Sequence, residues 1–388
     1  MNTTIENHIK INTEKQLKFF NEKEGNLLFC TEYGSTSTSD PSYISTIEGQ
    51  IPAEAFPYSN WPYNKDFIGK HAYDLGIQYT QLAKGAASYH SEIGDDWVPY
   101  IWVSWGTGGD TALLTGGEDD VVFYEGYSTF KEPVIKDWRD LDKLKLDLDN
   151  FWIKSLRDFW RGVESAYELE GVTVSPVQFR APMDFAHELR GNDLFYDFYD
   201  YPDEVDALIE FCTDSIIKIS RHLGDEFPIF RNAPGGTWGT VFGKDTLWLN
   251  GDPVDLISDQ LASRFFVPSI QKLISEIGGV FLHHHSIGYK KIKLLNQIEN
   301  LSLQEIAQDP NGPILLDFID DEMIKASHRV PIRLDANILE TENLDQLMDK
   351  LSQGRFILYV GIGDIGIYNK ENIKKYRSTL RCLRKYFR

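Results

Sequence analysis

The residues with the clearest chemical potential are three consecutive histidines in the run GGVFLHHHSIG, residues 278–288. An apolar run bounded by glycines predicts a short buried strand whose last residues reach a polar space. Because side chains alternate along a strand, His283 and His285 share a face with Phe281, and His284 takes the other face. Neutral imidazole is a common metal ligand and general acid or base, so the pair predicts metal binding or proton transfer. The competing interpretation is that these histidines only form hydrogen bonds at a strand end, and His284 is expected to be structural.

Further polar residues follow short apolar runs in separate parts of the chain. They are Arg180 after VQF, Asp184 behind it, Arg231 and Asn232 after PIF, Asp252 in the loop LNGDP, Asp335 and Asn337 after RL, and Asp364 after VGIG. Each of them alone fits a turn or a helix cap. If the runs are parallel strands, their carboxyl ends meet at one edge, and the polar residues converge on one candidate site.

The elements that would position these residues alternate between strand and helix. Strand patterns occur at 97–105, 172–179, 228–231, 279–285, 314–316, 330–334 and 355–360, and helical patterns at 66–86, 151–170, 202–223, 256–276, 290–298, 320–326, 344–351 and 371–387. Such alternation predicts an α/β fold, most simply a (β/α)8 TIM barrel, with its chemistry on the loops that follow the strands. Residues 1–90 lack this rhythm. We therefore expect an N-terminal helical and irregular extension over 1–90 and the barrel over 91–388.

Aromatic residues are dense between Trp97 and Trp105, and Trp238 lies in a second glycine-rich loop. Trp105 and Trp238 are candidates for an apolar lid over the substrate, although aromatic clusters are more often packing residues of a core. The loop at 106–109 lacks the glycine spacing of a phosphate-binding fingerprint and a following Lys-Ser/Thr, so no nucleotide is expected.

The charge balance restricts the partners. With 39 basic and 59 acidic residues the formal net charge is −20, which repels phosphate backbones and anionic lipids, so neither nucleic acid nor membrane is expected. The chain shows no signal-peptide pattern and no apolar run approaching about 20 residues, which predicts a cytoplasmic protein. Cys30, Cys212 and Cys382 are far apart, which argues against a thiolate metal cluster and a disulfide framework. Nothing in the sequence predicts the oligomeric state.

Several segments together resemble the uroporphyrinogen decarboxylase superfamily. They are an Asp-Asp-x-x-Pro start at Asp95–Pro99, the run LRGNDLFYDFYDYPDEV at Leu189–Val205, a His-x-x-Gly strand end at His285–Gly288, and the late FILYVGIGD. The resemblance spans roughly residue 95 to the C-terminus. It implies a (β/α)8 barrel and a choice between the haem-pathway decarboxylase and methyltransferases that move methyl groups between corrinoid proteins and thiols or other acceptors.

The decarboxylase itself is not expected. That enzyme grips its substrate's propionates with an N-terminal RQAGR motif, whereas here the first arginine is Arg139. The methyltransferase branch has a zinc site that begins His-x-Cys, and the matching positions here are His285 and Ile287. A thiolate-rich site is therefore absent, and the expectation is a harder divalent-metal site, zinc for example, made by His283, His285 and a carboxylate such as Asp335 or Asp364.

Three functions of different classes remain open. The leading hypothesis is methyl transfer or demethylation of a small molecule, linked to a corrinoid protein, with His283 and His285 in proton or metal chemistry and Asp184, Arg180, Arg231 and Asp252 orienting the substrate. A second is cofactor-free decarboxylation, with Asp184 or Asp252 stabilising a protonated intermediate and an arginine holding the carboxylate. The third is a catalytically inactive small-molecule-binding barrel. Glycoside hydrolysis ranks lower, because no carboxylate pair across a cleft is evident.

Overall fold

The computed structural model describes residues 3–22, 25, 27–30, 65–123, 129–167, 171–175, 177–309, 311–335, 338–340, 342–360 and 370–387. Its centre is a seven-stranded sheet in which every adjacent pair is parallel. In spatial order its strands are β1 (Leu27–Cys30), β13 (Phe356–Tyr359), β12 (Ile332–Asp335), β11 (Leu301–Ala307), β10 (Gly279–His285), β9 (Thr246–Asn250) and β6 (Phe179–Arg180). This mainly parallel sheet among helices confirms the α/β class.

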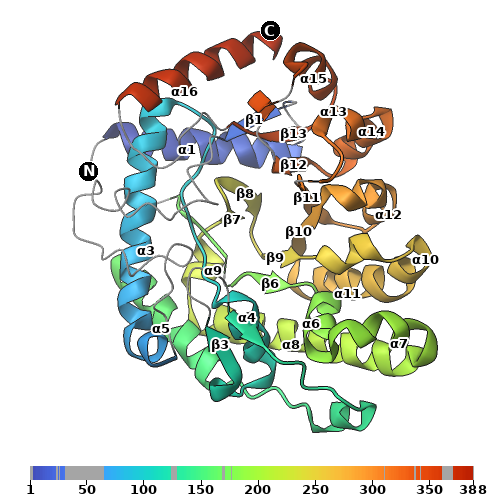
Figure 1. Ribbon diagram of the computed structural model, residues 1–388. Coiled ribbons are helices and arrows are strands. Elements are labelled where there is room, and N and C mark those ends of the chain that lie inside the picture. Colours follow the sequence, from blue (N-terminus) through green and yellow to red (C-terminus); the bar gives the residue numbers. More distant parts are fainter. Residues whose placement is uncertain are drawn as a thin grey trace.

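The other strands of the described residues form two smaller sheets. One has the order β2 (Tyr100–Ile101), β5 (Thr173–Val174), β7 (Gly235–Thr237) and β8 (Thr240–Gly243), in which β7 and β8 form an antiparallel hairpin. The other is the antiparallel pair β3 (Val121–Phe123) and β4 (Thr129–Lys131). In Figure 1 the β7–β8 hairpin lies on the inner side of the main sheet, away from the helices that follow its strands.

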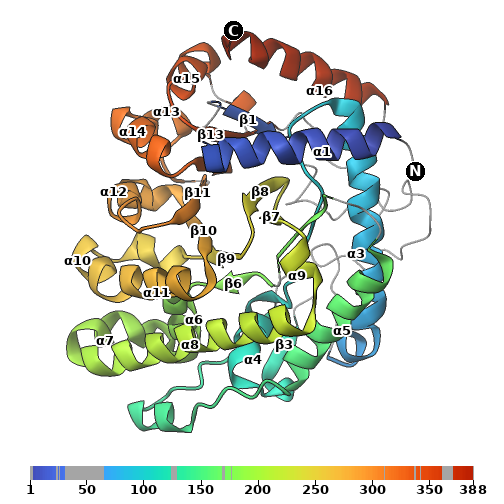
Figure 2. The same ribbon diagram turned by 180° about the vertical axis from the view of Figure 1, so that it is seen from behind.

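Helices connect the strands and line the outside of the structure, as Figures 1 and 2 show from two sides. In chain order they are α1 (Thr3–Leu17), α3 (Lys65–Ile93), α4 (Gly106–Thr115), α5 (Phe151–Ala166), α6 (Pro182–Arg190), α7 (Leu194–Asp200), α8 (Pro202–Glu226), α9 (Ile229–Asn232), α10 (Asp259–Leu261), α11 (Val267–Ile277), α12 (Ile292–Leu295), α13 (Leu315–Phe318), α14 (Asp321–Arg329), α15 (Leu344–Leu351) and α16 (Lys370–Leu383). In the part of the chain that the structure describes, none of these helices is long and apolar enough to cross a bilayer.

Sequence pattern explains most of the longer helices. In α5 the Asn150 side chain caps the first turn by accepting from the Ile153 amide, and residues such as Trp152, Leu156 and Phe159 form its buried face. The helices predicted at 151–170, 202–223 and 344–351 are present as α5, α8 and α15.

Two predictions about short elements were wrong, and one strand was not predicted. The run Pro228–Arg231 is not a strand, because Ile229–Asn232 forms the helix α9, and the strand expected at 314–316 is the start of α13. β11 was missed because its sequence LSLQEIA carries two polar residues that are buried, Gln304 and Glu305. Periodicity cannot separate helix from strand over three or four residues, so these segments were decided by tertiary packing.

The N-terminal segment does not lie wholly outside the sheet. β1 falls within residues 1–90, which were expected to be an extension, yet it pairs with β13 along its whole length. Its four residues are all buried, as in a central strand. The sheet therefore requires this segment, whereas the proposed boundary near residue 90 and closure into an eight-stranded barrel stay predictions.

The strand register sets a polar row above an apolar one on the inner face of the sheet. Arg180, Asn250, His283, Glu305 and Arg333 are consecutive partners across β6, β9, β10, β11 and β12. Two residues earlier in β10, Phe281 is partnered by Trp248 of β9 and Leu303 of β11, and all three are fully buried. Residues in register on adjacent strands point to the same face, so an apolar layer supports a polar layer at the carboxyl ends of the strands.

Where α3 and α5 cross, glycines let the two backbones approach closely. A Cβ at Gly162 would collide with the Tyr73 carbonyl oxygen, whereas a Cβ at Gly224 in α8 would meet no atom within 4 Å. We expect Gly162→Ala to lower the free energy of unfolding by about 1–3 kcal/mol through overpacking. Gly224→Ala, the matched control, should raise it by about 0.5–1 kcal/mol through helix propensity. Urea unfolding of both variants checks this, and equal effects would contradict the close packing.

Candidate functional site

The histidine strand places two imidazoles together and separates the third. His283 Nε2 lies 3.4 Å from His285 Nε2 on the inner face at the end of β10. His284 points the other way, is fully buried, and contacts Asp255 with Nδ1 at 3.3 Å. Asp255 also accepts from the His285 amide at 2.6 Å, so it holds the strand end in place. The alternation predicted from the sequence therefore separates a candidate functional pair from one structural histidine.

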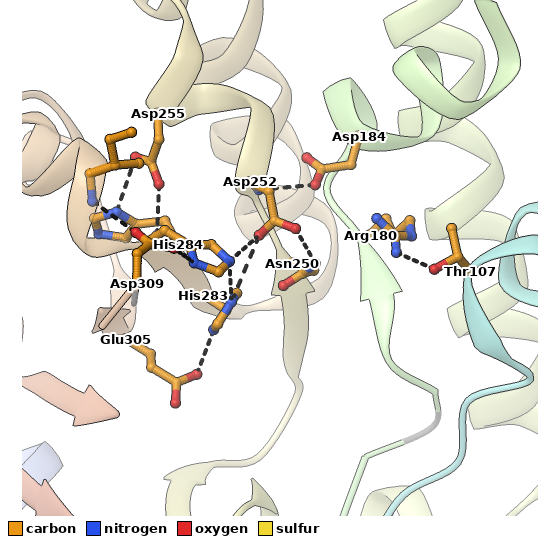
Figure 3. A network of polar contacts seen from close by, with 12 residues as sticks. Thr107, Arg180, Asp184, Asn250, Asp252, Asp255, His283, His284, Glu305 and Asp309 are labelled. Carbon is orange, nitrogen blue, oxygen red and sulfur yellow. Dashed lines mark hydrogen bonds and ion pairs between the residues drawn. The ribbon is translucent and has the colours of Figure 1, made fainter. Parts of the chain in front are cut away.

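Asp252 joins the two imidazoles from the neighbouring strand. It follows β9 directly, and its Oδ1 lies 3.4 Å from His285 Nε2 and 3.7 Å from His283 Nε2 (Figure 3). The other oxygen, Oδ2, accepts from the side-chain Nδ2 of Asn250 at 2.9 Å, and this hydrogen bond orients the carboxylate. Among the described residues Oδ1 has no hydrogen-bond partner, so we treat its contacts with the imidazoles as ion pairs.

Two outer carboxylates bind the far sides of the imidazoles. Glu305 of β11 lies 3.0 Å from His283 Nδ1, and Asp309, just after β11, lies 2.8 Å from His285 Nδ1. An ionised carboxylate only accepts hydrogen bonds, so each Nδ1 must be the donor. In a neutral imidazole Nε2 then carries a lone pair, and in both rings Nε2 faces the other imidazole and Asp252. Sequence reasoning missed both acids. A glutamate inside an apolar strand was the available signal, and it was lost because that strand was not recognised.

Charge coupling in this cluster shifts the pKa values in opposite directions. The contact with Asp252 is the largest cause that raises the pKa of His285, to about 9, and it outweighs the effect of burial. Burial alone would raise the pKa of Asp252, but contact with His285 and the charges of both imidazoles outweigh it and lower that pKa. Without a bound cation, the site therefore favours a protonated His285 paired with an ionised Asp252 at neutral pH.

The donor set fits a divalent cation. Asp252, His283 and His285 each offer one ligand atom, and these atoms all lie within 4.8 Å of one another. A tetrahedral zinc ion with ligand bonds of about 2.0–2.1 Å separates its ligand atoms by about 3.4 Å, close to the 3.4, 3.4 and 3.7 Å found here. Three protein ligands leave a fourth position for another group. Nitrogen and oxygen donors make a harder site than thiolates do.

Asp335 was the carboxylate expected in this set. Its backbone pairs with Ala307, whose other partner is His285, so Asp335 lies two strands from the histidine. Its side chain and the whole of Asn337 and Asp364 lie outside the described residues. Among the described side chains, the carboxylate close to both imidazoles is that of Asp252.

A second polar wall faces the cluster from β6 and the helices beside it. Asp184 Oδ1 accepts from the Asp252 amide at 3.0 Å, and Arg180 donates to Thr107 Oγ1 at 2.7 Å (Figure 3). Burial, followed by the charge of Asp252, raises the pKa of Asp184 well above its usual range, which favours its protonated form. Arg180 and Asp184 therefore stand beside the imidazole cluster, as the sequence suggested, with one charged donor and one carboxylic acid.

Other predicted site residues lie elsewhere. Arg231 and Asn232 are exposed on α9; Arg231 pairs with Asp225 at 2.8 Å and lines a cavity of about 420 Å³ that Asp245 and Thr246 also border. Because those two residues flank the amino end of β9, this cavity is at the opposite end of the strands from the histidines. The prediction placed these residues after a strand that is in fact the helix α9.

The two candidate tryptophans behave differently. Trp105 is 2% exposed and belongs to the apolar core, which agrees with the interpretation of this residue as a packing residue. Trp238 is partly buried at the tip of the β7–β8 hairpin, with its ring centroid 6.1 Å from that of His283. It thus contacts the candidate site, but from the side of the apolar layer.

A buried acid near Arg180 gives a pH-dependent expectation. Asp110 accepts from the Trp105 amide at 2.8 Å and from Ser104 Oγ, and burial raises its pKa to about 7. Because this pKa is higher in the folded protein than in the unfolded chain, folding favours the protonated form of Asp110. The free energy of unfolding therefore falls as the pH rises toward 7. Asp110→Asn keeps an acceptor for Trp105 and gains a donor for Ser104. From pH 5.5 to 8 the wild type should lose about 2 kcal/mol more unfolding free energy than this variant. Urea unfolding of both proteins at several pH values measures this difference. An equal loss of unfolding free energy in the two proteins would contradict a raised pKa of Asp110.

Comparisons with known proteins found a solved structure with a similar fold. No protein-family model matches the chain, and no curated protein matches it. Among solved structures, a methyltransferase from Methanosarcina mazei superposes over 95% of this chain and 99% of its own, with a TM-score of 0.59 and 13% sequence identity. The two chains share a fold. At that identity the similarity extends to architecture and leaves the chemistry to be argued from the residues.

Proposed function

We propose that this protein is a methyltransferase or demethylase of the corrinoid-linked type, with its active site at Asp252, His283 and His285. We infer in addition that its strands close into the eight-fold barrel of the uroporphyrinogen decarboxylase superfamily. The shared fold with the archaeal methyltransferase supports the class. The observation that carries the site is the convergence of two imidazole Nε2 atoms and Asp252 Oδ1, with both Nδ1 atoms held by outer carboxylates.

The residues have distinct roles in this proposal. Asp252, His283 and His285 would hold a divalent metal such as zinc, and a bound metal of this kind lowers the pKa of a thiol or hydroxyl acceptor. Glu305 and Asp309 keep the imidazoles in the ligating tautomer. Arg180 and Asp184 would orient a small substrate beside the metal ligands, and a corrinoid protein would present or receive the methyl group above them.

Metal content and methyl transfer together test this function. The purified full chain is analysed for bound metal, titrated with Zn²⁺, and assayed with methylcobalamin as methyl donor against a panel of thiols. We expect one Zn²⁺ per chain and demethylation of methylcobalamin that stops when the metal is chelated. No metal binding together with no turnover would overturn the proposal and favour an inactive binding barrel.

Decarboxylation is a second candidate, because Asp184 is a buried acid with a raised pKa in the same wall as Arg180. A protonated carboxyl beside a guanidinium can hold a substrate carboxylate and protonate a carbanion. Release of CO2 from a small organic acid by the chelator-treated protein would favour this candidate over methyl transfer.

A further inference from the structure

A buried ion pair lies beside His283 in the same row of register partners. Glu305 is 0% exposed and Arg333 is 2% exposed, and they are register partners on β11 and β12. One Glu305 oxygen pairs with Arg333 Nη1, and the other lies 3.0 Å from His283 Nδ1. Both oxygens of the carboxylate are therefore used, one toward an arginine and one toward a candidate ligand.

The β7–β8 hairpin contacts Arg333 through Trp238. The Arg333 guanidinium lies over the Trp238 ring, 5.0 Å from its centroid, and Trp238 also contacts the His283 ring. The hairpin tip is itself anchored, since Gly239 O accepts from Gln16 Nε2 at 2.8 Å and the Val241 amide donates to Gln16 Oε1 at 2.6 Å. Trp238 adopts a positive φ of 47°, a conformation that non-glycine residues rarely keep unless their surroundings impose it.

We propose that Arg333 and Trp238 are positioning residues that fix the orientation of Glu305 and thereby the tautomer of His283. This inference rests on the proposed function, because the Nδ1–H tautomer of His283 matters only if His283 Nε2 binds a metal. Arg333 pairs with Glu305, and Trp238 contacts both Arg333 and the His283 ring, so in this proposal both residues act through Glu305 and the His283 ring.

The physical reason is that a buried carboxylate needs a fixed counter-charge. Removing one partner of a buried pair leaves the other as an uncompensated charge, and the remaining side chain reorients or recruits water. Glu305 would then no longer hold His283 Nδ1 as a donor, and Nε2 would lose its defined lone pair. Loss of such an outer partner typically weakens metal affinity by about 10- to 100-fold.

The chain supplies a matched control for this test. Arg355 is also buried, at 3% exposed, and also lies over an aromatic ring, 4.9 Å from the Phe19 centroid, but it precedes β13 at the amino end of the sheet. Arg333→Gln and Arg355→Gln both remove a buried guanidinium from an aromatic ring. Only the first touches Glu305.

The experiment measures Zn²⁺ affinity by competition with a chromophoric chelator, and the His283 tautomer by NMR of ¹⁵N-histidine-labelled protein. We expect Arg333→Gln to bind Zn²⁺ about 10- to 100-fold more weakly and to lose the single Nδ1–H tautomer, with Arg355→Gln within about twofold of wild type. Arg333→Lys, which keeps the charge but loses the fork, should fall between them, and it replaces Arg333→Gln if that variant does not fold. Trp238→Leu should shift the tautomer in the same direction.

Failure of this inference is distinguishable from failure of the proposed function. A folded Arg333 variant that keeps wild-type Zn²⁺ affinity and the wild-type tautomer overturns the inference alone. A wild-type protein that binds no Zn²⁺ overturns the metal site, and the tautomer of His283 in the two arginine variants then still decides whether Arg333 positions it.

Discussion

If the proposed function is right, replacing His285 by alanine should abolish Zn²⁺ binding and methyl transfer, and His283→Ala should do the same. Each change removes one of three ligand atoms and leaves an outer carboxylate without its imidazole partner, so the loss should exceed the roughly 10- to 100-fold expected when an outer partner alone is lost. Zn²⁺ titration and corrinoid-dependent methyl transfer measure the two effects.

His284→Asn is the control for these variants. His284 lies between the two ligands in sequence but faces the opposite side of the strand and contacts Asp255. An asparagine amide can still donate to that carboxylate, so metal affinity should stay within a few-fold of wild type. Turnover that survives in His285→Ala would remove this residue from the proposed active site.

The second large effect concerns the apolar layer that supports the site. Trp248 is fully buried on β9, and its ring contacts those of Trp102, Trp238 and Phe281. Trp248→Ala should lower the free energy of unfolding by about 3–5 kcal/mol, because the cavity cannot be filled by neighbours on separate strands. Equilibrium urea unfolding gives this value directly.

Trp248→Phe provides the comparison, because it keeps an aromatic ring against Phe281 and loses only part of the volume. It should cost clearly less than the alanine variant. A loss below about 1 kcal/mol for Trp248→Ala would mean that the interior rearranges freely, and the polar row above it would then lack the rigid support that a metal site needs.

In the proposed site, nitrogen and oxygen donors take the place of thiolates. Ile287, at the position where the sequence resemblance led us to look for a cysteine, is 61% exposed, beyond the end of β10. The structure places two other candidate metal ligands beside His285. They are His283, two residues earlier on β10, and Asp252, which follows the adjacent strand β9. The proposed site is therefore displaced into the strands and is bound by harder atoms.

The sequence alone determined the features that depend on local periodicity. Alternation along GVFLHHH put His283 and His285 on one face and His284 on the other, and the succession of apolar runs and amphipathic helices indicated an α/β fold. These follow from residues only a few positions apart, which is why a single chain reveals them.

Only the tertiary structure decided which carboxylates meet the imidazoles. Asp252, Glu305 and Asp309 come from segments on both sides of β10, and their contacts depend on which strands are neighbours and in which register. The same register put Asp335 two strands away, and the helical α9 sent Arg231 to the other end of the strands. A short apolar run can form either a helix or a strand, and only contacts with distant parts of the chain decide which of the two it forms. The register of a strand likewise depends on the packing of the whole sheet.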